Sequence, residues 1–272
     1  MTFIRFLLLF APLLFSCQES TQSVHENQNN VAQTAVKDTS TEQTINYQDI
    51  EKKFLLGQIK PQQNDQFVEI PVPIANRENL YMQKQALESF QKMQKTASKE
   101  NIQLQIISAF RSFTHQKWIW NSKFNGKRRS GGKNMAKEFP DPQKRVQAIL
   151  NYSAMPGTSR HHWGTDIDIN NLNNSYFESG KGKTEYEWLK KNAHKFGFYQ
   201  TYTANREDGY NEEKWHWSYT PLAKDFSYNY KKKISYADIK GFKGSEHAQD
   251  LKVIERYVLN NINNECMHEP GN

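Results

Sequence analysis

Cysteine is scarce in this sequence. Among its 272 residues only Cys17 and Cys266 are cysteines. If either one is otherwise engaged, no intramolecular disulfide can form. The fold must then rely on its hydrophobic core, and 36% hydrophobic residues over this length are enough to build one.

Long apolar runs are scarce as well, and the one that stands out lies at the very start. Residues 1–16, MTFIRFLLLFAPLLFS, place one arginine before an apolar run of about ten residues. Such a run is too short to span a bilayer as a helix and is typical of a secretory signal. Residues 14–17, LFSC, resemble a bacterial lipobox, so we expect cleavage before Cys17 and a lipid on its thiol. The alternative is an ordinary signal peptide followed by a coincidental cysteine.

Aromatic residues are missing from residues 18–46, which are rich in Gln, Asn, Ser and Thr. A segment of this composition cannot bury enough apolar surface to fold. We therefore expect residues 17–46 to form a disordered tether behind the lipidated Cys17, residues 47–265 to form one folded domain, and residues 266–272 to form a tail. In this interpretation the protein is exported and anchored to a bacterial membrane, facing the periplasm or the cell surface.

Acidic residues are outnumbered, 29 against 36 lysines and arginines, which gives a formal net charge of +7. In an exported protein this excess favours anionic envelope polymers or membrane surfaces and argues against nucleic acid. A merely soluble surface explains the charge equally well. A basic run with two glycines, Lys127 to Lys133, predicts a mobile solvated loop, with contact to an anionic glycan or lipid as the alternative.

Hydrophobic periodicity predicts helices and strands in mixed order, and hence an α+β domain in which a small antiparallel sheet carries the site and helices flank it. The predicted strands are 66–72, 104–110, 166–169 and, as a short strand or turn, 212–219. The predicted helices are 79–97, 113–124, 143–152, 184–197 and 245–261.

Histidines and acids gather in the stretch TSRHHWGTDIDI, residues 158–169. Gly164 allows a turn between His161 and Asp168. In the strand that follows, Asp166 and Asp168 share one face while the isoleucines between them face the core. Of the adjacent pair His161 and His162, one is expected to be a ligand, and the residues alone leave that choice open.

A second cluster, Glu213-Lys-Trp-His216, can complete a metal site. Catalytic zinc commonly takes three ligands from His and carboxylate and keeps a fourth position open. His216 supplies the third ligand, and Glu213 is placed to act as general base toward a water. Residues three apart point to opposite faces of a regular strand, so a turn or bulge must lie between Glu213 and His216.

These motifs resemble the zinc D-Ala-D-Ala carboxypeptidases of the VanY type, with their D,D-dipeptidase and L,D-carboxypeptidase relatives. The family pattern stands here as Ser108-Ala-Phe-Arg111-Ser, then Ser159-x-His161-x-x-Gly164 with Asp168, then Glu213-x-Trp215-His216. Three separated motifs in the right order cover roughly residues 104–219, which makes the resemblance specific.

The resemblance implies a ligand set and a set of catalytic roles. It implies that His161, Asp168 and His216 bind Zn²⁺, that Glu213 is the catalytic base and that Arg111 stabilises the oxyanion. Weaker assignments to substrate binding are Ser159, Gln116, Trp215 and Tyr219. Asp166 departs from the pattern, because a small residue is frequent there.

The expected function is a monomeric zinc metallocarboxypeptidase that removes the C-terminal D-alanine from peptidoglycan stem peptides, with D,D- or L,D-specificity. One alternative is a D,D-dipeptidase or a peptidoglycan endopeptidase of the same fold. Another is a non-catalytic wall-binding lipoprotein, since the fold also resembles the zinc-bearing signalling domain of hedgehog proteins. Intact Glu213 and Arg111 argue against a structural zinc, which needs neither a base nor an oxyanion donor.

Overall fold

A computed structural model of the chain describes residues 50–267. The expected signal at 1–16, the lipidated Cys17 and the tether to residue 46 lie outside the described residues. Within the described range no helix is both long and apolar enough to cross a membrane. Helices surround two small antiparallel sheets, so the predicted α+β class is confirmed.

A four-stranded sheet carries the residues singled out by the motifs. Its strands, in spatial order, are β3 (Ile106–Ser108), β4 (Asp166–Ile169), β6 (His216–Tyr219) and β5 (Phe198–Gln200). All three pairings are antiparallel. The β4–β6 register sets Asp168 opposite His216, so the second and third motifs meet across one strand pair.

The second sheet has two strands, β1 (Phe67–Glu69) and β2 (Tyr81–Gln83), and leads directly into α2 (Lys84–Ser98). The helix predicted from residue 79 therefore begins five residues late. The apolar residues Leu80 and Met82 fit a helical spacing equally well, but Met82 lies opposite Val68 in the sheet. Pairing with a distant strand overrides local periodicity here.

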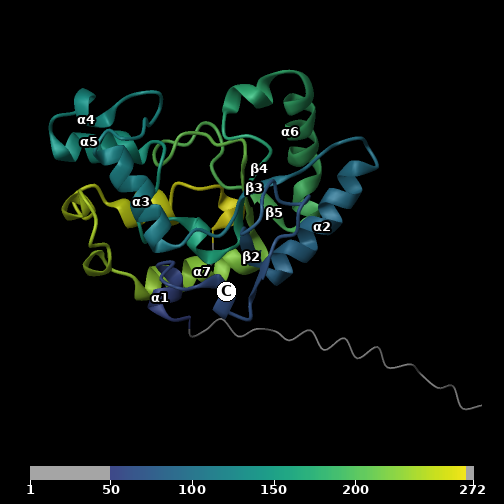
Figure 1. Ribbon diagram of the computed structural model, residues 1–272, viewed down its shortest axis with the longest axis horizontal. Helices are drawn as coiled ribbons and strands as arrows, with labels where there is room; N and C mark the ends of the chain where they lie inside the picture. The colour runs from purple at the N-terminus through teal and green to yellow at the C-terminus, as the bar shows by residue number, and fades with distance from the viewer. Residues whose placement is uncertain (1–49, 268–272) are drawn as a thin grey trace, which may run out of the picture. The chain divides into compact units, whose positions relative to one another are not determined.

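Helices lie on either side of the four-stranded sheet, with α3, α4 and α5 on one side and α2 and α6 on the other (Figure 1). Their bounds are α1 (Lys52–Leu55), α3 (Phe113–Phe124), α4 (Met135–Glu138), α5 (Pro142–Leu150), α6 (Gly180–Asn192) and α7 (Thr220–Lys233). The predicted helix 113–124 matches α3, because the Ser112 side chain caps it by accepting a hydrogen bond from the His115 amide. Asp141 caps α5 in the same way, ahead of Pro142.

Three sequence-based predictions need correction. The helix predicted to run to Gly197 changes to a 3-10 turn at Ala193–Phe196, and β5 follows it. The region 245–261 is not an α-helix: it contains a 3-10 turn at Ser245–His247 and a π-helix at Ile254–Leu259. The short helix α4, which follows the basic run, and the helix α7 were not predicted.

The isoleucines of β4 anchor the sheet in the core. Ile167 and Ile169 are fully buried, as are Ile106 of β3 and Trp163 just before β4. Because one face of β4 is fixed by this packing, the alternate residues Asp166 and Asp168 are held on the other face. The predicted division of the strand into an apolar and an acidic face is confirmed.

Candidate active site

A tight turn at Gly164 brings His161 beside β4. Residues Arg160–Trp163 form a 3-10 helix that ends at Gly164 with a left-handed φ of 71°. A Cβ at this glycine would lie 2.3 Å from the ring of Phe67, so both the conformation and the space require glycine. The histidine pair thus lies in a 3-10 helix that precedes the strand.

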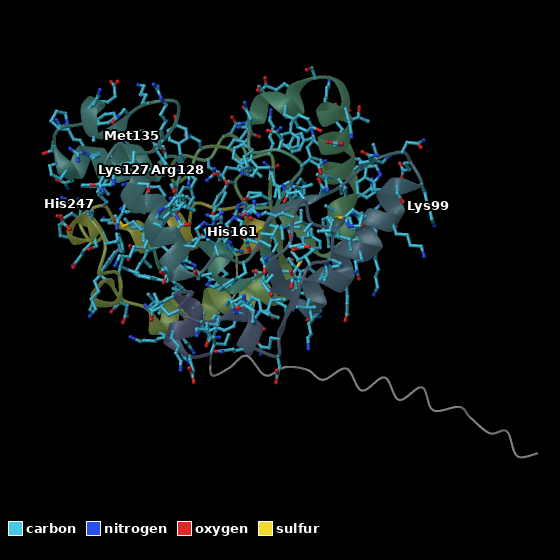
Figure 2. All side chains as sticks on the ribbon, in the orientation of Figure 1. Lys99, Lys127, Arg128, Met135, His161 and His247 are labelled. Carbon is cyan, nitrogen blue, oxygen red and sulfur yellow. The ribbon has the colours of Figure 1, made fainter. Side chains whose placement is uncertain are left out.

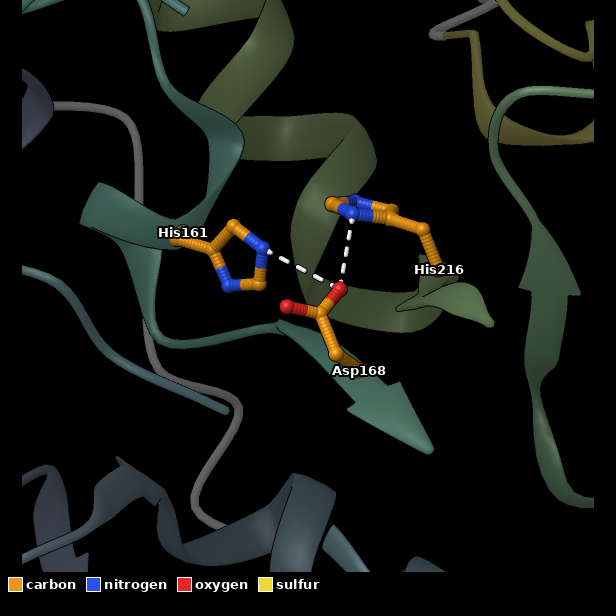
Figure 3. A group of neighbouring side chains, drawn as sticks. All are labelled: His161, Asp168 and His216. Carbon is orange, nitrogen blue, oxygen red and sulfur yellow. Dashed lines mark ion pairs between the residues drawn. The ribbon is translucent and has the colours of Figure 1, made fainter. Parts of the chain in front are cut away.

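His161, Asp168 and His216 converge on a common point (Figure 3). The carboxylate oxygen Oδ1 of Asp168 lies 3.4 Å from His161 Nε2 and 3.2 Å from His216 Nδ1. One donor atom from each of the three side chains lies within 4.8 Å of the other two. All three residues are buried, so their orientations are fixed by packing.

The donor set fits a zinc ion. Asp168 Oδ1 is buried and has no hydrogen-bond partner among the described residues, although two imidazole nitrogens face it. His161 Nδ1 donates to the carbonyl oxygen of Ala109 at 2.9 Å, which leaves the Nε2 lone pair for a metal. His216 Nε2 donates to Asp166 Oδ2 at 2.9 Å, which leaves Nδ1. Two imidazole nitrogens and a carboxylate oxygen are the ligands of many catalytic zinc sites.

The hydrogen bonds of His161 and His162 show that the two adjacent histidines have different roles. His162 Nδ1 donates to the carbonyl oxygen of Arg111 at 2.5 Å, and Nε2 accepts from the amide of Gly157 at 3.0 Å. Both ring nitrogens are therefore engaged, and burial lowers the pKa of His162 to about 3. His162 is a neutral buried group that ties together two loops, and only His161 of the pair has a free nitrogen at the site.

Asp166 forms a buried polar network behind His216. Its carboxylate accepts hydrogen bonds from Arg160 Nε at 2.9 Å and from Ser218 Oγ at 2.7 Å, besides that of His216. Arg160 is 1% exposed. Its guanidinium is held between Asp166 and Ser218, so Arg160 neutralises a second carboxylate next to the site.

The charges around His216 control its protonation. Burial opposes protonation, but the carboxylates of Asp166 and Asp168 outweigh this effect and raise the pKa of His216 to about 9. A metal ion at Nδ1 must therefore displace a proton, which makes metal affinity pH-dependent.

Glu213 lies beside the candidate ligand His216. The His216 amide donates to the Glu213 carbonyl at 3.3 Å, and this turn precedes β6. The turn expected between these residues is present, and it brings Glu213 Oε2 to 3.4 Å from His216 Nδ1. Burial and the Asp168 charge raise the pKa of Glu213 to about 7, against the pull of His216. A carboxylate with this pKa can accept and return a proton near neutral pH.

Arg111 is held against the same group by its neighbours. Its guanidinium donates to Gln116 Oε1 at 2.9 Å and to Ser108 Oγ at 3.1 Å, and lies 3.8 Å from Asp168 Oδ2. Gln116 is fully buried, and its amide nitrogen donates to the carbonyl oxygen of Ala154. Gln116 therefore orients Arg111, a different role from the expected contact with substrate.

A cavity of about 630 Å³ opens in front of these residues, and we call it the site cavity. Arg111, Glu213 and all three candidate ligands line it, as do the expected substrate-binding residues Ser159 and Trp215. Tyr219 does not line it in the described structure, because its ring packs on Phe198 with centroids 5.2 Å apart. The sequence motifs are thus gathered on one cavity, with Tyr219 left in the core.

The site cavity also has residues that the motifs did not reveal. Lys123 and Ile119 of α3, Arg128 from the basic loop, and Tyr202 with Tyr210 line it. Ile119 lies three residues after Gln116, and Lys123 lies four residues after Ile119. The helical repeat therefore places all three on one face of α3. No sequence signal placed Tyr202 and Tyr210 there.

Comparison with known proteins agrees with the motifs. Residues 79–222, more than half of the chain, match the family model described as VanY, D-alanyl-D-alanine carboxypeptidase. A putative carboxypeptidase, YodJ, of Bacillus subtilis is 32% identical over 143 residues, 51% of this chain and 46% of that protein. An uncharacterised protein of Haemophilus influenzae is 38% identical over 89 residues, 32% of this chain and 61% of that protein. A D-alanyl-D-alanine carboxypeptidase of Enterococcus faecalis is 32% identical over 89 residues, 32% of this chain and 31% of that protein.

The matched segments span less than two thirds of each of these relatives. Among solved structures, an LdcB LD-carboxypeptidase matches with a TM-score of 0.43 at 25% identity, covering 70% of this chain and 74% of that one. A zinc complex of a vancomycin-resistance D,D-pentapeptidase VanY matches with a TM-score of 0.46 at 21% identity, covering 70% and 92%. On the extent of the sequence match, this chain belongs to the VanY family of D-alanyl-D-alanine carboxypeptidases.

Proposed function

We propose that this protein is a zinc-dependent carboxypeptidase that removes the C-terminal D-alanine from peptidoglycan stem peptides. One observation carries the proposal. A convergent His161, Asp168 and His216 group shares the site cavity with a partly buried carboxylate, Glu213, and a fixed guanidinium, Arg111. A structural metal site would need neither of the last two.

The chain's own residues divide the reaction between them. His161, Asp168 and His216 would hold Zn²⁺, which when bound polarises the peptide carbonyl and acidifies the attacking water. Glu213 takes the proton of that water and returns it to the leaving amine, a cycle suited to its raised pKa. Arg111, fixed by Ser108 and Gln116, presents two N–H donors to the oxygen that becomes negative.

The test follows released D-alanine by mass spectrometry. Purified protein is incubated with pentapeptide and tetrapeptide muropeptides, with and without a chelator, beside a Glu213→Gln variant. Release from the pentapeptide indicates a D,D-carboxypeptidase, and release from the tetrapeptide alone an L,D-enzyme. Activity that survives both the chelator and Glu213→Gln would exclude the zinc mechanism.

We also propose that the protein is exported and anchored to a bacterial membrane through a lipid on Cys17. The support is the sequence LFSC at residues 14–17, behind a short apolar run. Labelled fatty acid should be incorporated into the parent chain in cells and not into a Cys17→Ser variant. Equal labelling of the two chains would contradict the anchor.

A further inference from the structure

The site cavity carries an excess of positive charge beyond the metal group. Lys123, Arg128 and Arg129 line it in addition to Arg111 and to Arg160, which is paired with Asp166. The acids that line it are Asp168, Glu212 and Glu213. Asp168 belongs to the metal group and Glu213 lies beside it at His216, so Glu212 is left against three cations. The part of the site cavity lined by these cations is therefore suited to bind an anion.

The charge of Lys123 is offset only in part, by attraction to the Glu213 carboxylate. Its ammonium group makes no ion pair or hydrogen bond with any of residues 50–267. Burial, followed by repulsion from Arg111 and Arg128, lowers the pKa of Lys123 to about 8. A partly buried cation without an ion-pair partner is costly, and an anionic ligand would relieve that cost.

Arg128 is held in place by an exposed tryptophan. The Arg128 guanidinium carbon lies 5.3 Å from the ring centroid of Trp118, which is itself 58% exposed. The Arg128 amide donates to the carbonyl of Ser122 at 3.0 Å, so the loop continues directly from the end of α3. Figure 2 shows Lys127 and Arg128 at this end of α3, next to Met135 of α4. The large exposed ring of Trp118 thus serves to position a cation.

We propose that Lys123 and Arg128 form a carboxylate-binding subsite in the site cavity. The inference rests on the proposed function and deepens it, because it names the part of the peptide that these residues recognise. Two carboxylates have this chemistry: the C-terminal carboxylate of the leaving residue, and a side-chain carboxylate on the residue before it, as in diaminopimelate. An amine or a neutral side chain would not be held by two cations.

Binding is measured by calorimetry with the zinc-loaded, full-length Glu213→Gln chain, so that ligand is not consumed. Three peptides are compared: one ending in diaminopimelyl-D-alanine, one ending in lysyl-D-alanine, and the first with an amidated C-terminus. Lys123→Met is tested beside Lys117→Met, a control on the same helix that lines a different cavity. Lys123→Arg, which keeps the charge, is the rescue variant.

Lys123→Met should weaken binding about tenfold or more, the scale of one lost charged hydrogen bond, while Lys117→Met stays within about twofold. An equal loss for diaminopimelyl and lysyl peptides, absent for the amide, assigns the C-terminal carboxylate. A loss confined to the peptides with diaminopimelate assigns the side-chain carboxylate. Unchanged affinity for all three peptides, or no binding of any of them to the parent, would overturn the subsite.

Hydrolysis by the chain with Glu213 intact is followed in parallel, so the two proposals can fail separately. If no peptide is cleaved but binding still depends on Lys123, the proposed function is wrong and the subsite stands. If peptides are cleaved and Lys123→Met cleaves and binds as the parent does, the subsite is wrong and the function stands.

Discussion

At the scale of single residues, Asp166 is the main departure of this chain from the motif pattern. Its carboxylate orients His216 and neutralises the fully buried Arg160. A hydrogen-bonded carboxylate behind a metal-ligating histidine fixes the ring and raises its basicity. Asp166 and Arg160 thus act together, and the charge of either alone would be buried without compensation.

Asp166→Ala should therefore destabilise the protein by about 3–5 kcal/mol, because the Arg160 guanidinium loses its buried partner. Zinc affinity should fall roughly 10–100-fold through His216. Urea unfolding and chelator competition measure the two effects. The double variant Arg160→Met with Asp166→Leu should recover most of the stability and none of the zinc affinity. A single variant as stable as the parent would contradict this account.

The lowered pKa of Lys123 makes the stability of the protein depend on pH. Its pKa is lowered from 10.5 to about 8 in the folded chain, so between pH 8 and 10.5 the unfolded chain binds more protons. The cost of burying the charged Lys123 is thus fully present below pH 8 and disappears as pH rises to 10.5. The free energy of unfolding of Lys123→Met minus that of the parent should be positive at pH 7 and should shrink by pH 10. A difference in the free energy of unfolding that does not change with pH would show that folding does not lower the pKa of Lys123.

At the scale of elements, the turn between the 3-10 helix Arg160–Trp163 and β4 decides whether the ligands meet. Gly164 has a left-handed φ, and a side chain there would press on Phe67. Ser159, His161 and Asp168 all lie within five residues of this glycine. Any shift of the turn would therefore move the ligand pair His161 and Asp168 apart.

Gly164→Ala should destabilise the chain by roughly 2 kcal/mol or more, the sum of left-handed backbone strain and steric overlap. The matched control is Gly241→Ala, which has a φ of 85° but open space around the added carbon. The control should cost only about 1 kcal/mol, for strain alone. Thermal and urea unfolding of both variants provide the comparison, and equal costs would mean that the contact with Phe67 is accommodated.

At the scale of the whole molecule, the three candidate ligands join separate parts of the chain. His161 comes from the 3-10 helix before β4, Asp168 from β4 and His216 from β6. Because the unfolded chain does not hold these donors together, a bound metal stabilises only the folded state.

Removing zinc should lower the Tm by about 5–10 °C. This follows from about 2.7 kcal/mol of stabilisation at a hundredfold excess of free zinc over Kd, and about 2–4 °C per kcal/mol for a domain of this size. Differential scanning calorimetry with and without a chelator measures the shift. His216→Ala should show little response to the chelator. An equal shift in both proteins would place the metal elsewhere.

Local sequence patterns were sufficient to predict those elements that short-range interactions determine. Residues 113–124 were predicted as a helix and form α3, which the Ser112 side chain caps, and the alternation of DIDI determined the two faces of β4. The spacing of His161, Gly164 and Asp168 indicated a turn, and the resemblance named the ligands that the structure brings together. The assignment of Tyr219 to the substrate was less successful, because its ring turns into the core.

The sequence by itself determined the α+β class and the two faces of β4, because strand alternation and helix periodicity act over a few residues, and its three motifs indicated the family; that the motifs meet on one cavity was decided by the tertiary structure. Only the tertiary structure decided that Tyr81–Gln83 is a strand, that His162 bonds two backbone groups and that Lys123 faces the site cavity. The strand that pairs with Tyr81–Gln83 and the Arg111 carbonyl bonded by His162 both lie more than ten residues away along the chain. Packing between distant segments, which no local pattern encodes, sets such contacts.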